Sequence, residues 1–128
     1  MTTVRRTAGA WLFLDASRNE LGESPLLFRR PIRVGRLHDN GEQAFYHLSG
    51  RSLNTWDVID FRRSLPAVKE GEIVVIGDAG AYTISHATRY SGLAPAVYLV
   101  NRDSKIQMIR RRETVSDVSA PMEPANGK

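Results

Sequence analysis

The 128-residue chain contains no cysteine. Disulfides, iron–sulfur clusters, cysteine-ligated zinc sites and thiol nucleophiles all need that residue, so the sequence excludes them. A cysteine-free chain is typical of a reducing compartment, and we therefore expect a cytoplasmic protein.

Long hydrophobic runs are also missing. The apolar stretches at 73–76 and 93–100 fall far short of the about 20 residues that a membrane-spanning helix needs. The apolar patch near the N-terminus is too short for a signal sequence and is interrupted by Asp15. We expect no membrane partner. With 41% hydrophobic and 25% charged residues, the chain has the composition of one compact domain.

Sustained helical periodicity is absent as well. Strand-like segments rich in Val, Ile, Leu, Tyr and Phe alternate with turn-forming residues, at 10–15, 26–33, 43–48, 58–62, 72–76, 81–85, 96–100 and 105–110. The segments 97–100 and 106–109 flank a turn and predict a hairpin. This pattern predicts an all-β fold: a mostly antiparallel, Greek-key-like β-barrel or sandwich with at most short helical turns. We expect the domain at 1–118 and a disordered, proline-rich tail at 119–128.

Positive charge is in slight excess, with 18 Lys and Arg against 14 Asp and Glu, a net charge of +4. A nucleic-acid-binding barrel needs its basic side chains gathered on one face with stacking aromatics between them. Here the arginine pairs are spread along the chain. This spread favours a solvated surface or protein contacts, so we expect no nucleic-acid partner.

Catalytic motifs are scarce. The three histidines lack metal-ligand spacing, and no serine lies in a Gly-x-Ser-x-Gly elbow. The densest run of small residues is GDAGAYT at 77–83. Its glycines let the backbone approach a phosphate closely, and Tyr82 adds a hydroxyl donor. The alternative is a tight turn between two strands, and the residues by themselves favour that turn.

Four stretches of the sequence resemble a known family, in the family's own order. They are WLFLDAS at 11–17, SGRSLNTWDV at 49–58, LPAVKEGE at 65–72 leading into GDAGAYT at 77–83, and RET at 112–114. Together they resemble the C-terminal β-barrel domain of the fold-type III, pyridoxal-phosphate-dependent amino-acid decarboxylases, which include the ornithine, diaminopimelate and arginine decarboxylases. The resemblance covers about residues 4–118.

The resemblance implies pyridoxal phosphate as cofactor, in an active site shared with a (β/α)8 body that carries the Schiff-base lysine. By position, Tyr82 is implied to hydrogen-bond the cofactor phosphate, and Gly80 to keep its turn close. Such a cofactor is not expected to bind this chain alone. No catalytic residue is assigned to the chain.

The resemblance implies that three positions face the substrate. Two of them depart from the family pattern and one matches it. Leu53 stands where the family has its catalytic cysteine, and Asn54 where it has an acid that pairs with a distal amine of the substrate. Asp57 matches the family, either as a ligand contact or as a strand-end acceptor that fixes the loop. The segment ESPLL at 23–27 lacks the arginine and tyrosine of the family's substrate-binding run.

The chain is also too short for the (β/α)8 domain, which typically needs about 250 residues. None of its lysines, at 69, 105 and 128, resembles the cofactor lysine. One hypothesis is the small β subunit of a split decarboxylase, not competent alone, acting on an amino-acid-like substrate in a hetero-oligomer with two copies of each chain. The alternative is a non-catalytic, decarboxylase-like interaction or regulatory module.

Overall fold

The computed structural model describes residues 1–22, 29–36, 41–80, 82–90 and 92–122. They divide into two compact units, Met1–Ser91 and Gly92–Lys128. The predicted domain boundary at 118 stays a prediction, and most of the predicted tail lies outside the described residues. In the described part of the chain, no helix is long and apolar enough to cross a membrane.

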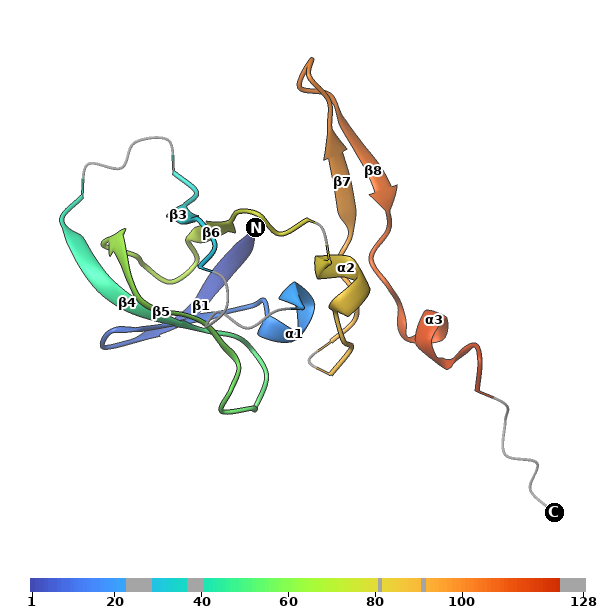
Figure 1. Cartoon of the computed structure of the whole chain (residues 1–128), viewed down its shortest axis with the longest axis horizontal. Coiled ribbons are helices and arrows are strands. Elements are labelled where there is room, and N and C mark those ends of the chain that lie inside the picture. The colour runs from blue at the N-terminus through green and yellow to red at the C-terminus, as the bar shows by residue number, and fades with distance from the viewer. Residues whose placement is uncertain (23–28, 37–40, 81, 91, 123–128) are drawn as a thin grey trace. The chain divides into compact units, whose positions relative to one another are not determined.

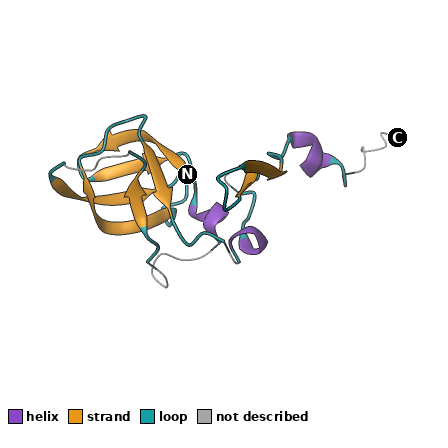
Figure 2. Ribbon diagram, turned by 90° about the horizontal axis from the view of Figure 1, so that it is seen from above, coloured by secondary structure: helices purple, strands orange, loops and turns teal. Residues whose placement is uncertain are grey.

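The first unit is built around a six-stranded sheet (Figures 1 and 2). Its strands are β1 (Thr2–Ala8), β2 (Trp11–Leu14), β3 (Ile32–Val34), β4 (Gln43–Ser49), β5 (Val58–Pro66) and β6 (Ile73–Ile76). They lie in the order β3-β6-β1-β2-β4-β5. Neighbouring strands are antiparallel except β2 and β4, which are parallel. The all-β fold class and its barrel character are confirmed.

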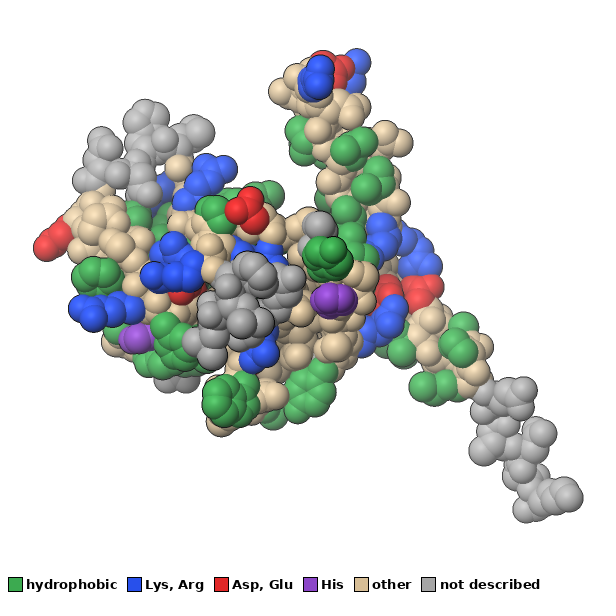
Figure 3. All heavy atoms as spheres, in the orientation of Figure 1, with side chains coloured by type: hydrophobic (Ala, Val, Ile, Leu, Met, Phe, Trp, Pro, Cys, Tyr) green, Lys and Arg blue, Asp and Glu red, His purple; other side chains and the backbone are tan. Residues whose placement is uncertain are grey.

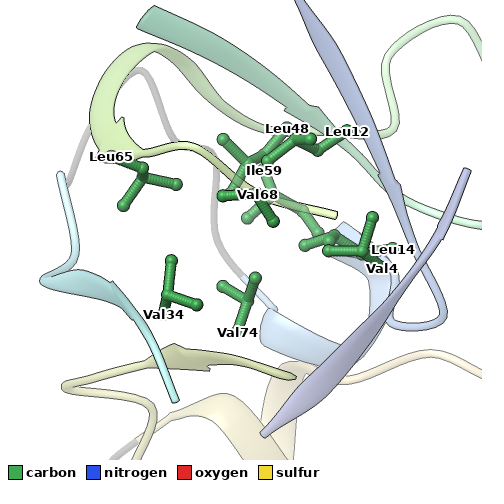
Figure 4. Packing of buried hydrophobic residues seen from close by; sticks show 9 residues of the cluster. All are labelled: Val4, Leu12, Leu14, Val34, Leu48, Ile59, Leu65, Val68 and Val74. Carbon is green, nitrogen blue, oxygen red and sulfur yellow. The ribbon is translucent and has the colours of Figure 1, made fainter. Parts of the chain in front are cut away.

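The core of this barrel is made of the inward-facing aliphatic side chains of its strands and of the turn after β5. In β2 the side chains alternate between half-buried and buried, as expected for a strand with one face on a core. Figure 4 shows the cluster, which consists of Val4, Leu12, Leu14, Val34, Leu48, Ile59, Leu65, Val68 and Val74. These residues carry most of the hydrophobic stabilisation of the unit.

Arginine side chains bridge the two edge strands of the sheet. The guanidinium of Arg63 in β5 donates to the carbonyl of Arg30, just before β3, at 2.7 Å. Arg36, just after β3, donates to the carbonyl of Ala67 at 2.7 Å, beyond the end of β5. Arg63 also pairs with the buried carboxylate of Asp60. These bonds satisfy edge carbonyls that a strand ladder would otherwise satisfy, so the barrel nearly closes.

A half-buried aspartate also fixes the start of the barrel. Asp15 follows β2 and accepts hydrogen bonds from the hydroxyl of Thr2 and from the backbone N–H of Thr3, the latter at 2.7 Å. Burial raises the pKa of Asp15, but these hydrogen bonds and the nearby Arg5 outweigh it, so the pKa lies below its ordinary value. The carboxylate is therefore charged at neutral pH and ties β1 to the end of β2.

Two short helices complete the first unit. Helix α1 (Arg18–Leu21) begins at a capping box formed by Ser17 and Glu20. Helix α2 (Thr83–His86) occupies the segment 81–85 that was predicted as a strand. That prediction was wrong because Tyr82 adopts a left-handed backbone conformation, with φ of 63°, and turns the chain out of an extended path into a helical turn. Ala81 lies outside the described residues.

The second unit begins with a hairpin of β7 (Val97–Val100) and β8 (Ile106–Arg110), which confirms the predicted hairpin. After β8 comes α3 (Val115–Ser119), which begins at a capping box of Thr114 and Asp117. Arg111 binds the Asp117 carboxylate with two hydrogen bonds of 2.6 Å. Apolar side chains are exposed along the hairpin (Figure 3), among them Tyr98, Val100, Ile106 and Met108.

Asp57 at the start of β5 holds the β4–β5 loop to α1. Only 2% of the residue is exposed. Its carboxylate accepts from the Ser17 hydroxyl at 3.0 Å, from the Arg18 N–H at 2.7 Å and from the Ser52 N–H at 2.8 Å. A Cβ added at Gly50 would come within 2.3 Å of this carboxylate, so only glycine leaves room for it. We call the Asp57 carboxylate and the four residues around it the Asp57 clamp; these residues are Ser17, Arg18, Gly50 and Ser52.

The Asp57 clamp gives a test of stability. Asp57→Asn replaces one of the two carboxylate oxygens by an NH2 group. In either orientation of the amide, this NH2 group faces an N–H donor of the protein and cannot accept a hydrogen bond from it. Since hydrogen bonds to a buried charged group are worth about 1.5–3 kcal/mol each, we expect a loss of about 3 kcal/mol in the free energy of unfolding. Denaturant unfolding followed by circular dichroism measures it.

Asp78→Asn is the matched control. Asp78 is exposed, and asparagine tolerates its positive φ of 50°. We expect a change below about 0.5 kcal/mol there. Equal unfolding midpoints for the two variants would contradict the structural role of the Asp57 clamp.

Candidate functional site

The loop that joins β4 to β5 projects beyond the ends of its strands (Figure 1). It presents two apolar side chains to solvent, with Leu53 fully exposed and Trp56 71% exposed. Between them, the Asn54 side-chain oxygen accepts from the Trp56 N–H at 2.9 Å and closes a tight turn. The loop therefore has a defined conformation while its apolar residues remain available for contacts.

Helices α1 and α2 lie side by side next to this loop. A Cβ added at Gly22, at the end of α1, would come within 2.8 Å of the His86 Cβ in α2. The Thr88 N–H donates to the Asn19 carbonyl at 2.8 Å. Glycine at position 22, with φ of 73°, thus permits both the end of α1 and the close approach of α2.

An open pocket of about 530 Å³ lies where α1, α2 and the β4–β5 loop meet. Its lining combines a cation, amides, rings and one carboxylate, and includes Arg18, Asn19, Asn54, Trp56, Asp57 and His86. The Asp57 clamp holds two of its three walls together, because it bonds both to α1 and to the loop.

The Tyr82 side chain lies beside this pocket. It is 66% exposed and is stacked at a tilt on the ring of His86, with 5.5 Å between the ring centres. Next to it, the Thr83 side chain is buried, and its hydroxyl has no hydrogen-bond partner among the described residues. The phenol of Tyr82 is thus held at the surface with its hydroxyl available to a ligand or a partner.

Gly80 precedes Tyr82 in the turn. Apart from its chain neighbours, nothing described lies within 4 Å of a Cβ added there, and its φ is not in the left-handed region. The chain's own packing therefore does not require glycine at this position. The open space beside Gly80 leaves its backbone accessible.

The structure brings some of the predicted residues together. Asn54 and Asp57 line the pocket. Tyr82 lies next to it, because its ring contacts the ring of His86, which is a lining residue. Leu53 lies at the loop tip and is not part of the lining. For Asp57 the structure displays the loop-fixing role, while a substrate contact stays a prediction. The segment 23–27 lies outside the described residues.

Six residues of the pocket were missed by sequence reasoning: Arg18, Asn19, Gly22, Trp56, His86 and Thr88. His86 was interpreted as a surface or strand residue because the three histidines are far apart in the sequence and lack metal-ligand spacing. On a helix, residues four apart lie on the same face, so the spacing of Tyr82 and His86 was the available signal. Arg18 follows Ser17, whose capping role a Ser-x-x-Glu spacing indicates. No sequence signal places Trp56 at the pocket.

Comparison with known proteins gives a consistent family. No protein-family model matches the chain. A diaminopimelate decarboxylase of Synechocystis is 35% identical over 98 residues, which is 73% of this chain and 20% of that protein. A diaminopimelate decarboxylase of Methanocaldococcus jannaschii is 26% identical over 110 residues, which is 86% of this chain and 25% of that protein. The chain thus spans a quarter or less of the length of these two relatives.

Solved structures agree with the sequence relatives. The crystal structure of the M. jannaschii diaminopimelate decarboxylase has a TM-score of 0.83 and 25% identity, and the match covers 98% of this chain and 30% of that one. The match therefore spans both units and a minor part of the larger protein. The chain matches a β-barrel domain of the fold-type III, pyridoxal-phosphate-dependent decarboxylase family.

Proposed function

We propose that this chain is the β-barrel part of a pyridoxal-phosphate-dependent amino-acid decarboxylase, and that it completes an active site whose cofactor lysine lies on a separate (β/α)8 chain. In this proposal the assembly is cytoplasmic and contains two copies of each chain. The Synechocystis and M. jannaschii relatives are decarboxylases in which the matching part is a quarter or less of the protein. In this proposal a lysine-bearing (β/α)8 body supplies the rest of the enzyme.

The observation that carries the proposal is the exposed Tyr82. A non-glycine residue with a left-handed backbone is uncommon, and strain of this kind concentrates at binding sites. The Tyr82 hydroxyl forms no hydrogen bond within the described chain, and its ring is mostly exposed apart from its contact with His86. A phosphate oxygen supplies the missing acceptor.

The turn around Tyr82 is compatible with the phosphate end of pyridoxal phosphate. The backbone at Gly80 is open, the Tyr82 hydroxyl is a neutral donor, and the buried Thr83 hydroxyl is unpaired among the described residues. When bound, pyridoxal phosphate supplies an electron sink for the carbanion left by decarboxylation. The chain's own part is to hold the phosphate through Tyr82 and to shape the entrance with the β4–β5 loop.

The tip of the β4–β5 loop lacks the two functional side chains that the family pattern has there. Leu53 has no proton to donate, and Asn54 is neutral, so neither supplies the acid or the counter-charge that the family pattern has at these positions. We propose that the substrate is amino-acid-like but lacks the distal ammonium for which an acid is needed.

A second candidate function is a non-catalytic module that docks on a decarboxylase or another partner. The exposed Leu53 and Trp56 favour it, since large apolar side chains clustered on one loop mark protein contacts. This candidate leaves the conformation of Tyr82 without a use.

Capture of the tagged chain from the lysate of its source, followed by mass spectrometry and an absorbance spectrum, tests the proposal. We expect a stoichiometric (β/α)8 chain that carries bound pyridoxal phosphate, because the barrel lacks a cofactor lysine of its own. A chain that elutes alone, or with an unrelated protein and no cofactor, contradicts the split enzyme and favours the docking module.

Tyr82→Phe tests the phosphate contact in the reconstituted complex. Loss of one neutral hydrogen bond, worth about 1 kcal/mol, lowers the affinity for pyridoxal phosphate about fivefold. Equilibrium titration of the apo complex measures this. Tyr90→Phe is the control, since Tyr90 is also exposed and lies outside the turn. Equal affinities of the Tyr82 variant and the wild type would exclude the contact.

A further inference from the structure

The acidic groups around the pocket are already used by the chain itself. Both oxygens of Asp57 accept hydrogen bonds from the chain in the Asp57 clamp. Glu20 accepts from the Ser17 N–H at 3.1 Å and pairs with Arg51. All four carboxylate oxygens are therefore already engaged by the chain, and Asp57 is only 2% exposed.

Arg18, in contrast, has hydrogen-bond donors that the chain does not use. Its guanidinium donates one hydrogen bond, to the Trp56 carbonyl at 3.1 Å, and forms no ion pair with a carboxylate of the described residues. A guanidinium has five N–H donors in a planar fork that matches two oxygens of a carboxylate or phosphate. Arg18 thus lines the pocket with most of its donors unused.

The two amide side chains of the pocket also favour an anionic ligand over a cationic one. One of them, Asn54, stands where the family has an acid. The Asn54 oxygen is used by the Trp56 N–H, so its NH2 group is the part left for a ligand. The Asn19 nitrogen donates to Ser17 at 3.1 Å, which leaves its oxygen as a neutral acceptor. A neutral oxygen gives an ammonium no counter-charge, whereas Arg18 gives an anion a full one.

We propose that this pocket binds an anionic oxygen group, a carboxylate or a phosphate, with Arg18 as its principal contact and Asn54 as a further donor. The inference rests on the proposed function for one consequence only: the substrate presents an anionic group to this wall of the active site in place of a distal ammonium. Anion binding itself is a property of this chain.

The chain carries its own reporter for the test. It has two tryptophans, and Trp56 lines the pocket, whereas Trp11 is stacked on His47 in the barrel with 4.8 Å between the ring centres. In the full chain with Trp11→Phe, fluorescence therefore reports on Trp56 alone. The probes are glutarate, inorganic phosphate and cadaverine, titrated at constant ionic strength. Glutarate and cadaverine have the same five-carbon length and opposite charge.

We expect glutarate or phosphate to change the Trp56 fluorescence saturably and cadaverine to give no saturable change. The tighter of the two anions identifies the source of the anionic group. Arg18→Gln lowers the affinity for that anion about tenfold or more, since it removes a charged donor. Arg33→Gln, an exposed arginine of β3, removes the same charge outside the pocket and leaves the affinity unchanged.

Thermal unfolding confirms that both arginine variants fold. Saturable cadaverine binding, no binding of either anion, or equal anion affinity in Arg18→Gln and wild type overturns the inference. If the (β/α)8 chain is captured with its cofactor while the anions fail to bind, the proposed function stands and this inference fails. If the anions bind but no such partner is captured, this inference stands and the proposed function fails.

Discussion

The buried carboxylate of Asp57 is the interaction on which the candidate site depends. It bonds to the first residues of α1 and to the β4–β5 loop, two segments about 35 residues apart in the sequence, and the space it occupies demands glycine at position 50. Because every donor around it comes from the chain, the charge is compensated without a ligand. Two walls of the pocket are therefore preformed before any partner arrives. The third wall, α2, is added by the close packing of His86 on Gly22.

Most strands and the family resemblance could be predicted from the sequence, whereas the short helices were expected only as helical turns. Alternating apolar residues and turn-forming residues indicated most strands, and the hairpin β7–β8 was predicted with its bounds nearly right. Strand β1 was missed, because its sequence TTVRRTA holds two adjacent arginines and one large apolar residue. The strand predicted at 81–85 failed because a single positive φ, at Tyr82, redirects the chain, and composition does not report it.

The candidate site shows the same division between local and tertiary information. Tyr82, Asn54 and Asp57 were found through family motifs, which are continuous in the sequence. Arg18 and His86 meet at one pocket because α1 packs against both α2 and the β4–β5 loop, and the local spacing signals of each helix do not encode this packing. The change from acid to amide at position 54 was visible in the sequence. Its consequence was not, because only the structure shows that the amide oxygen is consumed by the loop and that Arg18 in the pocket forms no ion pair with a carboxylate of the described residues.

In the proposed enzyme the barrel supplies contacts to the cofactor and substrate but not the lysine. Lys69 and Lys105 are both exposed, and Lys105 pairs with Asp103 at the hairpin turn. Borohydride reduction with pyridoxal phosphate, followed by peptide mass mapping of the isolated chain and of the captured complex, tests this most directly. We expect a stoichiometric pyridoxyl group on one lysine of the (β/α)8 chain and only trace, scattered labelling of the lysines of the barrel chain. A stoichiometric pyridoxyl group on Lys69, Lys105 or Lys128 would contradict it.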